Sequence, residues 1–576
     1  MFRRIGWAAL VLALIALGCS GTVGELPLSD GGAGVGAIDA GAKDAGSVDA
    51  GIVDSGQPDA GTDDAGRPDA GAADAGHGQD SGVLDSGVDD AGTDDAGVPD
   101  AGTTTSCWPF NQPSTQTLRA SAKKVFAHYF SPYPISLDNK DPALDYYAKN
   151  YLQPDGESGK WAFCGGLLRD RPLPQTPWAS GVDWEEKNME TEVHRAIQIG
   201  LDGFTFDVLS LTAGGQHRTR MEKLLDAAHA VDPEFVILLV PDMTAGAFGG
   251  GGGTDSDALA GLQTLLSAEG AKPAVMKLAD GRIVLSPFAA EKRTAAFWSN
   301  ALSVLADAGY PVALVPMPVG SWSSNASKFS GVTLYGASSW GTRTVSGAAS
   351  LQTAPQLPHS NGLVWMGPIG PQDSRPKNLQ FTEANNSAAY RAQWDATIAG
   401  GADWVQLITW NDYSEDTEVA PSAMTHTAFF DLSAYYTTWF KLGAQPPIVR
   451  DALYAFYRAH SMDPAVAPPD LTKQESAMVG KNGPATSTDE IELVGFLTAP
   501  GTLEIAIGGQ THTLDVSAGI QRFTLPLEEG TPTFKLVRGG TTVISLTGST
   551  AINNTIVYQD PLYHADAKPT CVPYGQ

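Results

Sequence analysis

Cysteine, basic residues and several familiar catalytic motifs are scarce or missing in this sequence of 576 residues. Four cysteines are too few for a disulfide-dense scaffold. The balance of 36 Lys and Arg against 64 Asp and Glu gives a formal charge of −28, which disfavours nucleic acid as a partner. No cluster of His, Cys and Asp has zinc-like spacing, and no metal or other cofactor is expected. No Gly-x-Ser-x-Gly elbow occurs, which argues against acyl transfer.

The first 20 residues have the pattern of an export signal. Two arginines precede an apolar run, residues 5–17, that is too short to span a bilayer. The run ends in ALGC, which resembles a bacterial lipobox, so residues 1–19 are interpreted as a signal peptide and Cys19 as a lipidation site. The protein is therefore expected at the outer membrane or cell surface, held only by that lipid. Simple secretion and an N-terminal transmembrane anchor are the alternatives.

Residues 20–106 are dominated by Asp-Ala-Gly repeats and close variants. Between residues 21 and 105, 18 acidic and two basic residues carry more than half of the net charge. Few aromatic residues and much glycine mean that the segment cannot bury enough surface to offset its ordering entropy. A disordered linker is therefore predicted. Calcium binding is the alternative, although the repeat spacing varies too much for a regular ligand set.

Three cysteines remain after Cys19. Cys107 opens the predicted folded region and Cys571 closes it, so a disulfide between them would join both ends in an oxidising compartment. That pairing, with Cys164 free, is the prediction. A Cys107–Cys164 bond is the alternative.

Residues 107–462 contain eight short apolar segments that alternate with stretches of helical periodicity. Each segment is rich in β-branched residues, as expected of strands buried on both faces. The alternation predicts a (β/α)8 barrel rather than an open doubly wound sheet, because no glycine-rich phosphate loop follows the first strand. The expected strands are 125–130, 203–208, 235–243, 274–278 with 282–288, 312–318, 332–337, 363–369 and 404–412. The expected helices include 189–200, 220–231, 388–401 and a final helix at 449–460.

Residues 463–576 show a different pattern, in which apolar and polar residues alternate between Gly and Pro turns. This pattern predicts an antiparallel β-sandwich. Its aromatic residues are few, so support of the barrel is favoured over sugar binding. The expected strands are 489–497, 501–509, 511–519, 520–530, 533–540, 541–548 and 555–559.

Polar and aromatic side chains follow the ends of the predicted barrel strands, where the active site of such a barrel lies. Asp412 and Glu415 come after the last strand and are the expected catalytic carboxylates. Aromatic rings stack on sugar C–H faces while carboxylates and amides bind hydroxyl groups, so glycoside hydrolysis is favoured. Trp340 is a further aromatic residue near the sixth strand. The expected sugar-binding residues are His128, Tyr129, Asp207, Asp242, Tyr335, Trp365, Trp410, Asn411 and Tyr413.

The segments VFAHYF, GLDGFTFDV and ADWVQLITWNDYSED resemble glycoside hydrolase family 71, the α-1,3-glucanases or mutanases. The resemblance covers about residues 123 to 560 and implies a barrel followed by a β-sandwich. The family's WNDYGES segment carries its proposed catalytic pair, which matches Asp412 and Glu415. Ser414 and Asp416 replace the Gly and the Ser of that segment. Serine tolerates a positive φ poorly, and the added carboxylate can raise a neighbour's pKa.

The resemblance implies hydrolysis of α-1,3-glucan with inversion by a monomeric enzyme whose partner is the polysaccharide. Glu415 is expected to protonate the glycosidic oxygen and Asp412 to activate water, and the reversed roles are an alternative. Inverting enzymes hold their carboxyl groups ~6.5–9.5 Å apart and retaining ones ~5–5.5 Å apart, which a loop leaves open. Two rival functions are cleavage of another α-glucan or an α-mannan, and non-catalytic glucan binding by a surface lipoprotein.

Overall fold

A computed structural model describes residues 107–481 and 488–576 of the chain. The predicted signal peptide, the lipidation site Cys19 and the predicted linker lie outside these residues. None of the helices in the described part of the chain is long and apolar enough to cross a membrane.

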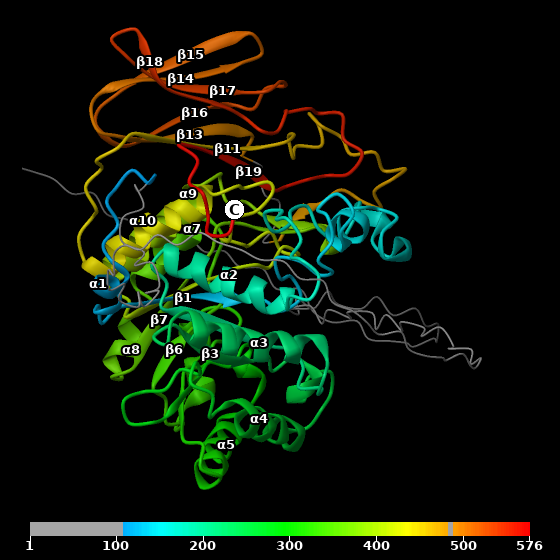
Figure 1. Cartoon of the computed structure of the whole chain (residues 1–576), viewed down its shortest axis with the longest axis vertical. Coiled ribbons are helices and arrows are strands. Elements are labelled where there is room, and N and C mark those ends of the chain that lie inside the picture. Colours follow the sequence, from blue (N-terminus) through cyan, green and yellow to red (C-terminus); the bar gives the residue numbers. More distant parts are fainter. Residues whose placement is uncertain (1–106, 482–487) are drawn as a thin grey trace, which may run out of the picture. The chain divides into compact units, whose positions relative to one another are not determined.

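Eight parallel strands form the barrel, in the order β5-β4-β3-β2-β1-β10-β7-β6. Backbone hydrogen bonds also join the two outer strands: Tyr335 N–H donates to Leu314 O at 2.9 Å and Ser338 N–H to Pro316 O at 3.0 Å. The ring is thereby closed, and the predicted (β/α)8 barrel is confirmed (Figure 1). The strands are β1 Lys124–Tyr129, β2 Gly203–Val208, β3 Val236–Pro241, β4 Ile283–Leu285, β5 Val312–Leu314, β6 Gly336–Ser338, β7 Val364–Ile369 and β10 Trp404–Leu407.

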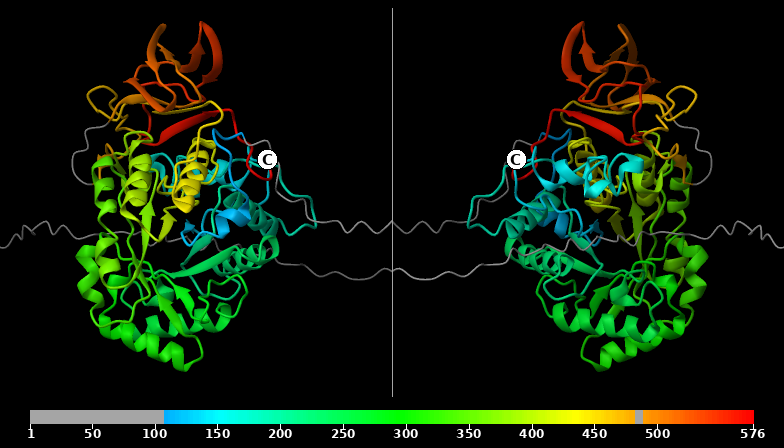
Figure 2. Two further views of the ribbon diagram at one scale, coloured as in Figure 1. Left: turned by 90° about the vertical axis from the view of Figure 1, so that its left-hand side faces the viewer. Right: turned by 90° about the vertical axis from the view of Figure 1, so that its right-hand side faces the viewer.

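Helices follow most of the strands, and the long helices α2, α4 and α5 begin at side-chain caps. Asp183 accepts the backbone N–H of Glu186 before α2, and Thr254 forms a capping box with Asp257 before α4. Figure 2 shows the helices around the strands from two sides. The long helices are α2 Trp184–Gln198, α3 Gln216–Val231, α4 Asp255–Glu269, α5 Ala295–Asp307, α9 Ala388–Gly400 and α10 Ala428–Leu442. The short ones are α1 Thr115–Arg119, α6 Trp322–Asn325, α7 Val345–Ala348 and α8 Gln356–Ser360.

The interior of the barrel changes from apolar to polar along the strands. Successive side chains of a strand point to opposite faces, so Phe126 and His128 of β1 point into the barrel while Tyr129 points toward the helices. Phe126 belongs to an apolar interior cluster near the amino ends of the strands. His128 lies among polar side chains nearer the carboxyl ends. The strand register therefore brings the polar groups together at one end.

The C-terminal region contains two four-stranded antiparallel sheets, as the sandwich prediction requires. Alternating side chains from both sheets form a separate apolar cluster. One sheet consists of β16 Gly519–Pro526, β13 Glu490–Leu497, β11 Ala452–Arg458 and β19 Tyr563–Lys568. The other consists of β15 Gln510–Val516, β14 Gly501–Ile507, β17 Thr533–Arg538 and β18 Thr541–Thr547.

Two secondary-structure predictions near this region are wrong. The expected helix at 449–460 is the strand β11, and the last barrel helix is α10 instead. Leu453 of β11 belongs to the sandwich cluster while its neighbour Tyr454 belongs to the barrel cluster. Burial on both faces removes the alternation that identifies a strand in the sequence. The expected strand at 555–559 is absent, and β19 is the last strand.

The helix α10 lies between the barrel strands and the sandwich (Figures 1 and 2). Its Tyr435 ring meets Phe496 of β13 edge-on at 5.0 Å. Next to it, Glu492 of β13 is fully buried and accepts hydrogen bonds from the backbone and hydroxyl of Ser387. Arg391 of α9 completes this contact with an ion pair to Glu492 at 2.9 Å. The sandwich is therefore fixed to the barrel by apolar and ionic contacts.

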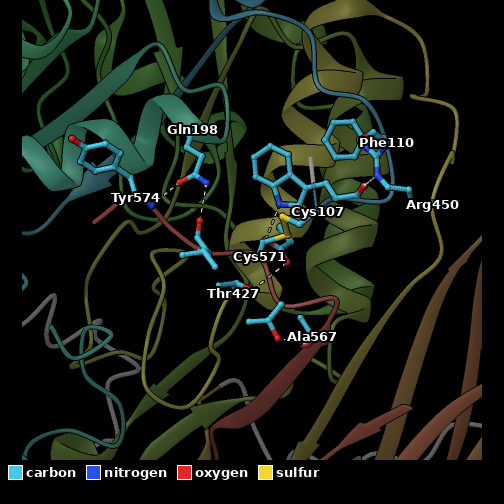
Figure 3. Close-up of a disulfide and its surroundings, with 12 residues drawn as sticks. Cys107, Phe110, Gln198, Thr427, Arg450, Ala567, Cys571 and Tyr574 are labelled. Carbon is cyan, nitrogen blue, oxygen red and sulfur yellow. Dashed lines mark hydrogen bonds between the residues drawn. A yellow bond between two sulfur atoms is a disulfide. The ribbon is translucent and has the colours of Figure 1, made fainter. Parts of the chain in front are cut away.

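A disulfide joins the two ends of the described region, as predicted (Figure 3). Cys107 and Cys571 are bonded across 464 residues of sequence, and Cys164 is free and buried. Beyond the disulfide, Gln198 of α2 accepts a hydrogen bond from Tyr574 N–H at 3.0 Å. The last residues of the chain are thereby attached to the helical layer of the barrel.

Candidate active site

Asp412 and Glu415 lie in the segment that follows β10, at the carboxyl end of the barrel. These two residues are 5% and 8% exposed. Asp412 N–H donates to Thr409 Oγ1 at 2.8 Å, and Asp412 Oδ1 accepts hydrogen bonds from Ser414 N–H at 3.0 Å and Ser414 Oγ at 2.8 Å. Ser414 has no positive φ, whereas Asp416 has a φ of 49°. The serine therefore holds the Asp412 carboxyl without the backbone strain expected from the sequence.

Glu415 is held by a cation from a different segment. Its Oε2 lies 2.6 Å from Arg375 Nη2, at the end of β8, Asp373–Arg375. The backbone N–H of Ser374 also donates to Glu415 O at 2.8 Å. This short strand pairs with β9, Gln380–Thr382, which pairs with β12, Val479–Gly480. Both the main chain and the side chain of Glu415 are therefore fixed by β8.

The environment of Asp412 favours the protonated form. Burial, followed by the charge of Glu415, raises the pKa of Asp412 to about 7. Lys377, Arg375 and the hydrogen bond from Ser414 act in the opposite direction without cancelling the rise. A carboxyl group with such a pKa can hold a proton in mildly acidic solution.

Two further carboxyl groups lie at the ends of β2 and β3. Asp207 and Asp242 are each 5% exposed. Asp242 Oδ1 accepts the N–H and the hydroxyl of Thr244, both at 2.7 Å, whereas Asp207 Oδ1 has no hydrogen-bond partner in the protein. Burial and then the charges of Asp242 and Asp412 raise the pKa of Asp207. Asp207 Oδ1 is therefore a buried acceptor that the protein leaves unpaired.

His128 supports this cluster from inside the barrel. Its Nδ1 lies 3.1 Å from Gln406 Nε2 and 3.3 Å from Thr205 Oγ1. Burial lowers its pKa to about 3, so the ring is neutral. The half-buried Trp340 meets the imidazole edge-on at 5.0 Å, and Phe288 packs against the same indole. Trp340 is therefore the aromatic side chain that follows β6 at this end of the barrel.

The chain is similar to known proteins over most of the region that the structure describes. A family model named glycosyl hydrolase family 71 matches residues 179–566. The chain belongs to glycosyl hydrolase family 71. The resemblance inferred from the sequence is thereby confirmed, and the protein is a glycoside hydrolase.

Named relatives agree with this membership. The chain is 24% identical over 403 residues to glucan endo-1,3-alpha-glucosidase agn1 of Schizosaccharomyces pombe, which covers 65% of this chain and 89% of the relative. It is 25% identical over 216 residues to a mutanase of Penicillium rubens, with coverage of 34% and 46%. A GH99 endo-alpha-mannosidase of Bacteroides thetaiotaomicron is a structural neighbour at 14% identity and a TM-score of 0.42, covering 55% of this chain and 97% of that one.

Three of the expected sugar-binding rings of this family 71 hydrolase are placed in its core instead. Tyr129, Trp365 and Trp410 are at most 1% exposed and belong to the main apolar cluster of strands and helices. The Tyr129 hydroxyl contacts Met189 Sδ at 3.3 Å, and Trp410 Nε1 donates to Glu192 Oε2 at 2.7 Å. These rings point outward from the strands, so they cannot stack on a sugar at the mouth.

The structure also places three other expected sugar-binding residues away from a sugar. One lies near the amino ends of the strands, and two are buried in the fold. Tyr335 precedes β6 and packs on Trp404, which belongs to the apolar interior cluster near the amino ends. Asn411 Oδ1 accepts the N–H of Phe130 at 2.7 Å and fixes the chain after β1. Tyr413 is 1% exposed and buried beside the catalytic segment. These three residues are not placed to contact a sugar.

Arg375, which sequence reasoning missed, forms the ion pair with Glu415. It comes from the insertion between β7 and α9, where no periodicity marks a strand. The only sequence signal is the polar run PQDSRPK directly after an apolar strand. Among the described residues, no group of His, Cys, Asp and Glu has the arrangement of a metal site.

Proposed function

We propose that this hydrolase cleaves α-1,3-glucan with Asp412 and Glu415 as its catalytic pair. The proposal rests on the placement of both carboxyl groups on one segment at the carboxyl end of β10, where both are buried and the charge of Glu415 raises the pKa of Asp412. Membership of family 71 and relatives named as endo-1,3-alpha-glucosidase and mutanase support this linkage. The enzyme acts as a monomer on a polysaccharide chain.

Hydrolysis needs one carboxylic acid and one carboxylate on opposite sides of the scissile bond. The acid protonates the departing glycosidic oxygen while the carboxylate activates water, and the product then has an inverted anomeric centre. Asp207, Asp242 and Trp340 are the side chains we assign to substrate binding. Asp207 has an unpaired buried oxygen that can accept a hydrogen bond from a hydroxyl group, and the half-buried Trp340 is the ring that can stack on a sugar face. The edge-on contact with His128 holds the Trp340 ring at this end of the barrel.

A polysaccharide panel tests the linkage preference. Insoluble α-1,3-glucan, α-1,4-glucan and α-mannan are incubated with the wild type and with Asp412→Asn, and the released reducing ends are measured. Release from α-1,3-glucan alone supports the proposal, and equal release from α-mannan contradicts it. Proton NMR of the fresh product gives the stereochemistry: a β-anomer supports inversion, whereas an initial α-anomer indicates retention. Glucan binding without cleavage by the wild type indicates a lectin instead.

We also propose that residues 1–19 direct export and that residues 20–106 tether the folded region, residues 107–576, to a lipid on Cys19. The disulfide supports an oxidising compartment. Labelled palmitate should be incorporated by the wild type expressed in a bacterium and not by Cys19→Ala. Equal labelling of both variants places the lipid on a residue other than Cys19, and no labelling of either indicates secretion without a lipid.

A further inference from the structure

The two carboxyl groups of the proposed catalytic pair are held in different ways. Glu415 Oε2 lies 2.6 Å from Arg375 Nη2. Within the described residues, no nitrogen of a Lys, Arg or His side chain forms an ion pair with Asp412, whose Oδ1 is bound by Ser414. A contact with a cation favours the ionised form of a carboxyl group, and a hydrogen bond from a neutral hydroxyl favours it less.

Arg375 is itself fixed by a second carboxylate. Asp373 accepts Arg375 Nε at 2.7 Å and Nη2 at 2.9 Å, and it also pairs with Lys481 at 3.1 Å. Arg375 is 6% exposed and Asp373 is 5% exposed. Lys481, Asp373, Arg375 and Glu415 thus form a row of alternating charges, which runs from the segment after β12 to the catalytic pair. The guanidinium therefore cannot turn away from Glu415 without breaking three contacts.

Charged groups from other elements also surround the pair. Burial acts to lower the pKa of Arg375, but the charges of Asp373 and Glu415 outweigh it and raise that pKa. Separating this buried ion pair leaves an uncompensated charge, so the paired state is strongly preferred. The titratable groups that face Asp412 or Glu415 are Tyr133 after β1, Asp207 in β2, Arg343 after β6, Asp373 and Arg375 in β8, and Lys377.

We propose that Arg375 is a positioning residue that keeps Glu415 as a carboxylate, so that Glu415 activates the water and Asp412 donates the proton. This inference rests on the proposed function and reverses the roles expected from the sequence. Asp412 gives its proton to the glycosidic oxygen as the bond from that oxygen to the anomeric carbon breaks. Glu415 accepts a proton from the water whose oxygen bonds to that carbon. Exchange with solvent then returns both groups to their starting forms.

The pKa of about 7 at Asp412 agrees with this division of roles. A general acid is effective when its pKa lies near the working pH, because it is then protonated and still able to release the proton. Groups whose environments favour opposite charge states are the usual acid and base of a pair. The alkaline limb of the pH profile is thereby assigned to Asp412.

A substrate whose leaving group needs no proton separates the two roles. An α-1,3-linked glucooligosaccharyl α-fluoride releases fluoride without general acid catalysis. We expect Asp412→Asn to lose about 10²–10⁴-fold on α-1,3-glucan and to stay within about tenfold of the wild type on the fluoride. Glu415→Gln is expected to lose activity on both substrates. Retention on the fluoride by Glu415→Gln, or loss of fluoride activity by Asp412→Asn, overturns the assignment.

The pH dependence of kcat/KM tests Arg375 itself. Arg375→Gln is expected to move the acid limb to higher pH by about one to three pH units and to move the alkaline limb less. Arg375→Lys keeps a cation, so its acid limb should lie close to that of the wild type. This variant keeps the test decisive if Arg375→Gln folds poorly. Arg391→Gln, which breaks an ion pair away from the site, is the matched control and should leave both limbs in place.

Uniform loss of activity without a moved limb, or a larger movement of the alkaline limb, overturns the role of Arg375. Failure of the proposed function gives a different result. If both carboxyl variants keep wild-type activity on the glucan, the catalytic pair is wrong and this inference fails with it. If both lose activity but Glu415→Gln alone recovers on the fluoride, the pair stands and only the division of roles is wrong.

Discussion

The two ends of the barrel interior contain different kinds of side chain. Near the amino ends of the strands, Phe126, Leu238 and Met366 form a dry apolar cluster. At the carboxyl ends, the equally buried groups are carboxyls such as Asp207 and Asp412. Burial of apolar surface stabilises a fold, whereas burial of polar groups costs free energy unless they are paired. Stability is therefore expected to depend on the amino end and chemistry on the carboxyl end.

The largest stability effect is expected at the amino end. Phe126 is fully buried in the apolar interior cluster, so Phe126→Ala should lower the free energy of unfolding by about 3–5 kcal/mol. Chemical denaturation measures this change. The exposed Val345→Ala is the control, expected to change stability by less than about 0.5 kcal/mol. If Phe126→Ala kept the stability of the wild type but lost kcat, the amino end would serve catalysis rather than stability, which contradicts the comparison.

Removal of the disulfide is the next largest effect. The double variant Cys107→Ser/Cys571→Ser opens a covalent loop of 464 residues. It should lower the free energy of unfolding by about 2–5 kcal/mol. Thermal unfolding with and without a reducing agent should show the same loss in the wild type. Cys164→Ser is the control for a cysteine that forms no disulfide. Because the bond lies outside the polar end, the pH profile of kcat/KM should not change.

A pH-dependent effect is expected from Asp416 beside the catalytic pair. Burial, followed by the charge of Asp560, raises the pKa of Asp416. Because the folded-state pKa lies above the unfolded one, the stability from this group is complete below the unfolded value and is lost as pH rises. The slope approaches about 1.4 kcal/mol per pH unit. Asp416→Asn should reduce this loss in melting temperatures measured from pH 4 to pH 8, and an unchanged pH dependence contradicts it.

The smallest effect is expected at the outer end of the charged row. Lys481 is the most exposed member, with 34% of its side chain accessible, so its pairing with Asp373 is screened by solvent. Lys481→Met should change kcat/KM by less than about tenfold and move the acid limb less than Arg375→Gln does. Activity assays across pH compare the two variants directly. If both variants moved the acid limb equally, the contact from Arg375 would not be what keeps Glu415 ionised.

The barrel was predictable because its strands are buried on both faces and therefore read as short apolar runs. Asp412 and Glu415 were predictable because they follow the last of these runs. The direction in which each strand side chain points, into the barrel or toward the helices, was harder to predict. At a strand end the sequence does not determine whether a ring such as Tyr129 points inward or outward, since register decides it.

The strand β11 and the cation Arg375 show a different limit. The residues of β11 are buried against the barrel on one face and against the sandwich on the other. The sequence therefore lacks the alternation of apolar and polar residues that would identify a strand. Arg375 acts through a contact with Glu415, 40 positions further along the chain. Such contacts depend on the three-dimensional fold. An insertion between β7 and α9 carries no periodic signal that would reveal them.

The central claim is that the buried acidic pair at the carboxyl end of the barrel cleaves glucan. Its most direct test is the rate of reducing-end release from insoluble α-1,3-glucan by the wild type, Asp412→Asn and Glu415→Gln, together with their melting temperatures. We predict a loss of about 10²–10⁴-fold in rate for each variant, and Asp412→Asn, which breaks no ion pair, should keep the melting temperature of the wild type. Full activity in either variant, at an unchanged melting temperature, would contradict the claim.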